Sequence, residues 1–172
     1  LSLILLQSNN SIKFKEGLIK YESRWKRNGK EKPFINSKPE WKPKDRGTVL
    51  LWGEQGIGDE LIFASLIPEF VKKVDQLIVK VDKRLIPLFK RSFNKNIIYI
   101  ARNQRLEDEK FDFQIAMGSL IKHLRTDKES FKKGKKIYLK VDEMRTNIFR
   151  DKLLEDSNFK TIIGISWRSQ ST

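Results

Sequence analysis

Residues 48–63 carry the pattern that most limits what this chain can fold into. They read Thr-Val-Leu-Leu-Trp-Gly-Glu-Gln-Gly-Ile-Gly-Asp-Glu-Leu-Ile-Phe, an apolar run, a glycine-rich stretch and a second apolar stretch that opens with an acid. An apolar run that ends at glycines and leads into helical spacing predicts a strand, a tight loop and a helix. Ligands of open α/β sheets bind beyond the carboxyl ends of the strands, so residues 53–59 are the first candidates for chemistry.

The rest of the chain alternates between strand-like and helix-like segments. The apolar runs predict strands and the helical spacings predict helices, with strands at 48–52, 76–81, 97–100, 113–116 and 161–166 and helices at 59–74, 83–93, 118–124 and 146–154. This alternation predicts an α/β fold, a parallel sheet covered by helices on both faces. Pro68 falls inside the first of these helices and should kink it or cap a turn there.

Two segments precede this pattern. Residues 1–28 read as two short antiparallel helices, the second of which carries an apolar stripe at helical spacing, formed by Phe14, Leu18, Tyr21 and Trp25. Such a stripe indicates packing against a core. Residues 29–46 contain three prolines and a glycine, are followed by Gly47, and show no apolar period, which is typical of a linker. Trp41 within the linker should pin it to a neighbouring surface.

The composition limits the partners. The chain has 36 basic and 22 acidic residues and a formal charge of +14, but the lysines are scattered along it, which favours a solvated surface over a specific nucleic-acid site. A phosphate-rich partner stays the alternative. The densest cluster, residues 132–136, reads as an exposed loop. No apolar run approaches the roughly 20 residues of a membrane span, and the absence of cysteine excludes disulfides and is compatible with a cytoplasmic protein.

The glycine loop itself does not match the common phosphate-binding motifs. Its spacing G-x-x-G-x-G-D differs from the dinucleotide fingerprint G-x-G-x-x-G and lacks the Lys-Ser/Thr ending of the P-loop. An acid at Asp59 is a poor neighbour for a diphosphate and suits a hydroxyl better. Asp59 is also well placed to cap the helix that it opens, so a capping role and a chemical role both remain open.

These residues resemble a known family. Residues 51–60 with the following Phe63-Ala64, together with Ile163-Gly164-Ile165-Ser166-Trp167, are similar to the glycosyltransferase-like domain attached to bacterial tetratricopeptide-repeat proteins. That domain resembles the heptosyltransferases, whose GT-B fold has two Rossmann-like halves. Residues 17–25 look like the last helix of the repeat array. The resemblance implies a repeat end at 1–28, a linker at 29–46, a Rossmann-like acceptor-side half at 47–159 and the first strand of a truncated donor-side half at 160–172.

The resemblance also implies a site. Ile57-Gly58-Asp59 matches the Leu-Gly-Asp motif that supplies a general base in the family, so Asp59 would take the proton from an acceptor hydroxyl. The acceptor would be bound by Glu54, Gln55, Gly56, Gly58, Gly118 and Ser119, and the diphosphate of a nucleotide-sugar donor by Ser166, Arg168 and Ser169. Bracing the turn is the favoured role for Glu54, with acceptor contact as the alternative. The favoured reading of the segment that opens at Gly118 is an ordinary turn and helix start. His123 reads as a packing or surface residue.

The expected function is therefore the acceptor-side half of an inverting glycosyltransferase that uses a nucleotide sugar. No cofactor is expected, and no metal, because the chain has no Asp-x-Asp and one histidine. Both ends of the sequence look cut, so we expect this piece to be inactive in transfer by itself. The alternative is a non-catalytic module in which the repeats recruit a protein partner and the glycine loop holds a small ligand.

Overall fold

The computed structural model describes residues 10–29, 38–54, 56–93, 96–107, 110–132, 137–155 and 163–165. The chain divides into two compact units, Leu1–Leu139 and Lys140–Thr172. The first unit holds the sheet and the glycine loop. In the described part of the chain, no helix is long and apolar enough to cross a membrane.

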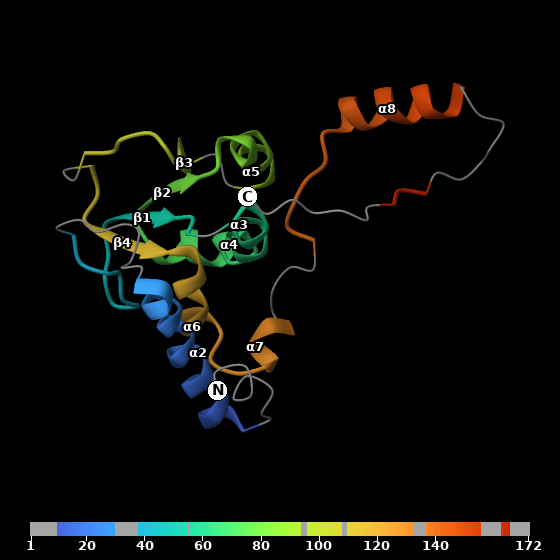
Figure 1. The fold of residues 1–172 in the computed structure, drawn as a ribbon. Coiled ribbons are helices and arrows are strands. Elements are labelled where there is room, and N and C mark those ends of the chain that lie inside the picture. Colours follow the sequence, from blue (N-terminus) through green and yellow to red (C-terminus); the bar gives the residue numbers. More distant parts are fainter. Residues whose placement is uncertain are drawn as a thin grey trace. The chain divides into compact units, whose positions relative to one another are not determined.

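The first unit is built on a four-stranded, all-parallel sheet with the strand order β3-β2-β1-β4 (Figure 1). The strands are β1 (Thr48–Trp52), β2 (Gln76–Val81), β3 (Ile98–Ala101) and β4 (Phe113–Ala116). Three of them have the predicted bounds, and β3 begins and ends one residue later than predicted. The α/β fold with a parallel sheet is therefore confirmed. β1 lies inside the sheet, so the loop that follows it opens at the middle of the carboxyl edge.

One face of the sheet is covered by helices. Alternate residues of β1, Val49 and Leu51, point into this larger core, which also contains Phe70 and Phe89. The helices that supply it are α3 (Ile57–Ala64), α4 (Ile67–Phe70), η2 (Val71–Lys73), η3 (Lys83–Leu85), α5 (Ile86–Ser92), η5 (Met117–Leu120) and α6 (Ile121–Leu124), where η marks a 3₁₀ helix. The predicted helices at 83–93 and 118–124 each begin with a 3₁₀ turn.

The prediction of one continuous helix at 59–74 is wrong. The helix begins two residues earlier, at Ile57, and is interrupted after Ala64, so that Pro68 falls in the first turn of α4. Proline lacks an N–H, and the first turn of a helix is where that N–H has no intrahelical partner. The chain therefore starts a new helix at Ile67, with Pro68 in its first turn, instead of carrying the proline through a continuous helix.

The opposite face carries a smaller apolar cluster with less helical cover. It consists of Leu50, Trp52, Ile78, Ile100, Phe111 and Ala116, with Trp25 and Leu106 packed against it. Trp25 is the helical residue among these partners, and Leu106 and Phe111 come from the segment 102–112 that joins β3 to β4. That segment is shorter than the dozen or more residues of a helical crossover, and its described residues Leu106 and Phe111 pack against this face. The expectation of helices on both faces therefore holds for the first face, and on the second face the helical residue that packs against the cluster, among those described, is Trp25.

The N-terminal helical segment belongs to the first unit and packs against its other helices. Helix α2 (Ser11–Tyr21) begins at Asn10, whose side chain accepts hydrogen bonds from the backbone N–H groups of Ile12 and Lys13 at 2.9 and 3.3 Å. It continues as η1 (Glu22–Gly29), and α2 lies beside α6 (Figure 1). Phe14 and Leu18 are buried, which confirms the predicted packing stripe. The other predicted helix of the pair lies almost wholly in residues 1–9, outside the described residues.

Trp41 fixes the predicted linker to the sheet. Its backbone N–H donates to the carbonyl of Gln114 at 2.9 Å, next to an isolated bridge between Glu40 and Gln114. Its side chain is fully buried, and its ring packs edge-on against Phe70 at 4.8 Å. The prediction that Trp41 pins the linker is confirmed.

The remaining elements are short or lie in the second unit. Helix α7 (Glu129–Lys132) ends at the exposed Lys132, and 133–136, the rest of the predicted lysine loop, lie outside the described residues. In the second unit, α8 (Glu143–Glu155) contains the helix predicted at 146–154. Of the strand predicted at 161–166, the structure describes 163–165. These residues are exposed and pair with no described strand, and without backbone hydrogen bonds to a neighbour they form no strand there.

We predict that Trp41→Ala lowers the free energy of unfolding by about 3–5 kcal/mol, because it removes a fully buried indole from the core and leaves a cavity. Chemical denaturation of the full chain measures it. Ile62→Ala is the control: Ile62 is 63% exposed, and its loss should change stability by no more than about 0.5 kcal/mol. Equal effects of the two variants would contradict the burial of Trp41.

Candidate functional site

The glycine loop leaves β1 at the carboxyl edge of the sheet and opens α3. Gly53 donates its N–H to the carbonyl of Lys80 at 2.8 Å, which extends the sheet by one bond. Gly56 precedes α3 in an extended conformation, and its N–H donates to Oδ2 of Asp59 at 3.2 Å. Asp59 is thus the third residue of α3 and caps the helix, as one of the two interpretations predicted. Asp59 is half-buried, and Gly56 and Gly58 beside it are exposed.

Position 53 has room only for glycine, because the carboxylate of Glu60 lies against its backbone. Glu60, which is 1% exposed, accepts from the backbone N–H of Asp82 at 2.9 Å and pairs with Arg102 at 2.5 Å. A Cβ at position 53 would lie 1.9 Å from Oε1 of Glu60. The sequence analysis missed Glu60, although a signal was present. Glu60 stands at the i+3 position of an i, i+3, i+4, i+7 face otherwise formed by Ile57, Leu61 and Ala64, which marks a charge on an inward face.

Glu54 joins the loop after β1 to the loop after β4. Its side chain is 1% exposed. Oε1 accepts from the N–H of Gly118 at 2.6 Å, and the carboxylate accepts from Nε and Nη2 of Arg24 at 2.6 and 3.1 Å. The structure therefore brings together Glu54, Gly118 and Ser119, three of the predicted acceptor residues. Glu54 braces both loops, in agreement with the structural role that was weighed for it.

Arg24 is the centre of this arrangement. Its Nη2 donates to Oγ of Ser119 at 2.8 Å, and its Nη1 donates to Glu22 at 2.7 Å. Its guanidinium carbon lies 4.4 Å from the ring centroids of both Tyr21 and Trp25. These are cation–π contacts that a planar guanidinium makes well. The side chain of Arg24 is 7% exposed.

Further charges complete what we call the Arg24 cluster, formed by Glu22, Arg24, Glu40, Glu54, Ser119 and Lys122. Lys122 Nζ lies 3.2 Å from Glu22 and 2.7 Å from Glu40. Burial raises the pKa of Glu22, but the hydrogen bond and positive charge of Arg24 outweigh it, so that this pKa is lowered. Burial lowers the pKa of Arg24, but Glu54 and then Glu22 outweigh it, and the pKa is raised. Both shifts favour the charged forms, the carboxylate of Glu22 and the guanidinium of Arg24. Glu22 and Arg24 lie within residues 17–25, which resemble a repeat helix, and the sequence pattern predicted no role for either.

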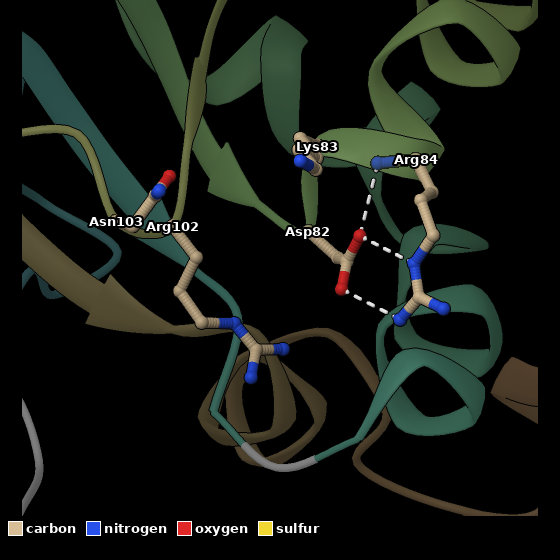
Figure 2. Close-up of a pocket in the computed structure, with 5 residues that line it drawn as sticks. All are labelled: Asp82, Lys83, Arg84, Arg102 and Asn103. Carbon is tan, nitrogen blue, oxygen red and sulfur yellow. Dashed lines mark hydrogen bonds and ion pairs between the residues drawn. The ribbon is translucent and has the colours of Figure 1, made fainter.

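A second polar region adjoins the loop through Glu60. An open cavity of about 680 Å³ is lined by Asp82, Lys83, Arg84, Arg102 and Asn103. Figure 2 shows these side chains, which come from the segments directly after β2 and β3, with Lys83 and Arg84 already in η3. Both Asp82 oxygens accept from Arg84 at 2.9 Å, and hydrogen bonds from Arg84 hold the pKa of Asp82 well below its usual range. The signal that could have found this cavity is the position of Asp82 and Arg102 directly after two parallel strands.

The remaining predicted site residues fall elsewhere. Gln55 lies outside the described residues, as do the three proposed donor-phosphate residues, Ser166, Arg168 and Ser169.

Tyr21 lies near the glycine loop. Burial raises the pKa of its hydroxyl, with smaller contributions from Glu54 and Asp59, and the centroid of its ring lies 6.5 Å from that of Phe63. Within the described ranges, no three carboxylate or histidine side chains gather closely enough to hold a metal ion.

Comparison with known proteins finds a distant relative. The chain is similar to Protein FlbA of Caulobacter vibrioides, with 31% identity over 178 residues that cover 90% of this chain. The chain spans 28% of that protein's length. No family model matches the sequence. No solved structure matches it either. The fold stated above therefore rests on the structure of this chain.

We predict that Gly53→Ala lowers the free energy of unfolding by about 1–3 kcal/mol, because the new methyl group must displace the held carboxylate of Glu60. Gly58→Ala is the matched control on the same loop, since a Cβ there meets no atom within 4 Å. It should leave stability unchanged or raise it by about 0.5–1 kcal/mol, because alanine is the better helix residue. Thermal or urea unfolding measures both, and equal losses would contradict the close approach of Glu60.

His123 packs against Trp41, with its ring edge-on at 5.6 Å. Among the described residues its Nε2 is buried and has no hydrogen-bond partner. Burial, followed by the charge of Lys122, lowers the pKa of His123 below its ordinary value of 6.5. The packing role predicted for His123 agrees with this contact.

We predict that the protein loses stability as the pH falls through about 6.5. The unfolded chain takes up a proton on His123 in that range, whereas the folded chain takes it up at lower pH, and no such loss occurs above the unfolded pKa. The pKa values of Glu22 and Asp82 are also lowered, but protonation of these carboxyl groups reduces stability only at more acidic pH. Unfolding measured from pH 8 to pH 5 tests this, and His123→Gln should flatten the curve. A wild-type curve as flat as that of the variant would refute it.

Proposed function

We propose that this chain is the acceptor-side half of an inverting glycosyltransferase of the GT-B class, preceded by the last helix of a tetratricopeptide-type repeat. The donor would be a nucleotide sugar and the acceptor a hydroxyl group. The proposal draws on the resemblance of the glycine loop and on one observation above all. Asp59 stands at the carboxyl edge of the innermost part of a parallel sheet, where ligands of such sheets bind.

The setting of Asp59 suits a general base. One oxygen, Oδ2, accepts from the N–H of Gly56, which orients the carboxylate. A carboxylate has two oxygens and about four acceptor positions, so a proton acceptor remains after capping. Gly56 and Gly58 beside it are exposed and carry no side chain, so that an acceptor can approach the carboxylate closely.

The proposed reaction is a displacement at the anomeric carbon. Asp59 takes the proton of the acceptor hydroxyl as that oxygen forms a bond to the anomeric carbon, and the bond from this carbon to the nucleotide's phosphate oxygen breaks. The nucleotide leaves with the bonding electron pair, and the anomeric configuration inverts. Ser166, Arg168 and Ser169 are proposed to bind the donor phosphates, since hydroxyl and guanidinium groups suit phosphate oxygens.

One observation favours the alternative, a non-catalytic interaction or ligand-binding module. Glu54 and Ser119, proposed to contact the acceptor, are buried and already hydrogen-bonded to Arg24. A crevice whose polar groups are satisfied internally needs no substrate to satisfy them. In the module reading, Asp59 is a helix cap and nothing more.

We predict that Asp59→Asn in the full-length protein lowers the rate of sugar transfer by about 10²–10⁴-fold, because the amide cannot take a proton. The substitution keeps an oxygen that can accept from Gly56, so the helix start should be preserved. Transfer from a panel of nucleotide sugars, followed by product detection, measures the effect.

Asp45→Asn is the matched control. Asp45 has the same intermediate exposure and accepts, through Oδ2, from the N–H of Lys42, also three residues earlier, at 2.7 Å. It precedes β1 and so belongs to the opposite edge of the sheet. Transfer that survives Asp59→Asn unchanged would remove the base assignment. A wild-type protein with neither donor hydrolysis nor transfer across the panel would favour the module.

A further inference from the structure

We propose that Arg24 is a positioning residue: the N-terminal helical segment uses it to hold the loops after β1 and β4 at the carboxyl edge of the sheet. The segment is then a working part of the site and not a separate module attached to it. The catalytic consequence rests on the proposed transferase function. The structural consequence, that the two loops depend on Arg24, does not.

The contacts of Arg24 reach both loops at once. Nε and Nη2 engage both oxygens of Glu54, on the loop after β1, at 2.6 and 3.1 Å. Nη2 also donates to Oγ of Ser119, after β4, at 2.8 Å. Glu54 closes the arrangement by accepting from the N–H of Gly118 at 2.6 Å. One guanidinium thus connects two loops separated by more than sixty positions in the chain.

The helical segment fixes the orientation of this guanidinium. The rings of Tyr21 and Trp25 each lie 4.4 Å from its central carbon, and Glu22 accepts from Nη1 at 2.7 Å. Trp25 packs in turn on Trp52, the last residue of β1, with ring centroids 5.5 Å apart. The guanidinium of Arg24 is therefore held in orientation by its own helical segment, so the side chain loses little conformational freedom when it pairs with Glu54.

Arg24 matters for Asp59 because of how the glycine loop is held. At its start, Glu54 is anchored by Arg24; at its end, Glu60 is anchored by Arg102 and by the N–H of Asp82. Asp59 lies between these two anchors, next to the second. Loss of the first anchor leaves the loop attached from one side, so that the carboxylate and the acceptor groups no longer keep a fixed spacing.

A lysine at position 24 should not replace the arginine. It supplies the charge but not the planar fork that spans two acceptors, nor the stacking between two rings. Glu54 is 1% exposed, and its carboxylate would then have an incomplete set of hydrogen-bond donors. Arg24→Lys is thus a mild test, which removes geometry and keeps charge.

The experiment compares Arg24→Lys with wild type in the full-length protein. Amide hydrogen exchange followed on peptides that span 52–60 and 116–120 should rise by about tenfold or more in both, because local opening becomes easier. In the transfer assay kcat should fall by about 10–100-fold with the donor KM within about twofold, since misplacement of a reacting group affects the chemical step.

Arg125→Lys is the matched control. Arg125 is also a buried arginine, paired with Glu69 at 2.7 Å and placed 5.8 Å from the Phe131 ring, but none of these contacts involves either loop. It should leave exchange in both peptides unchanged. Should Arg24→Lys not fold, Glu54→Gln tests the same anchor, because its amide nitrogen would face the donors of Arg24 and Gly118.

The outcomes separate this proposal from the proposed function. Unchanged exchange in both loops overturns the positioning role, and so does an equal rise in Arg125→Lys, which would indicate general destabilisation. Looser loops with an unchanged kcat in an active protein overturn its catalytic part. A wild-type protein without transfer activity defeats the proposed function alone, and the exchange result then decides whether Arg24 holds the loops.

Discussion

The buried ion pair between Arg24 and Glu54 is the contact on which the rest of the candidate site depends. It joins the N-terminal helical segment to the carboxyl edge of the sheet, and the two side chains are 7% and 1% exposed. Transfer of two charges out of water is costly, and the cost is recovered only where geometry is good and the remaining donors and acceptors are filled. Here Gly118, Ser119 and Glu22 fill them. Such a pair contributes little net stability compared with an apolar contact, but it specifies one arrangement of the loops.

The glycines of the site serve the protein's own carboxylates. A glycine after a strand usually indicates that a ligand approaches the backbone closely. At Gly53 the group that approaches is Glu60, and at Gly118 it is Glu54, whose Oε1 lies 2.2 Å from where a Cβ would stand. Gly56 and Gly58 differ, since they are exposed and a Cβ at Gly58 would meet open space. The part of the loop that a ligand can approach is therefore its second half, beside Asp59.

Two polar regions flank this open part of the loop. The Arg24 cluster binds the start of the loop, and the cavity at Asp82 and Arg102 adjoins its end through Glu60. Both depend on residues after parallel strands, where such sheets gather functional groups. Protein FlbA is similar to this chain over 90% of its residues, across both of its units.

The sequence by itself determined the elements whose signal is local. Apolar runs such as 48–52 and 76–81 became strands at the predicted positions, and Trp41, a large apolar residue in a polar segment, became core. It also located the glycine loop and the cap at Asp59. Tertiary structure alone decided how Glu54 and Glu60 are used, because Glu54 meets Arg24 and Gly118, 30 and 64 positions away, and Glu60 meets Arg102, 42 positions away. Contacts at such separations follow from strand order and helix packing, for which the local pattern of residues carries no signal.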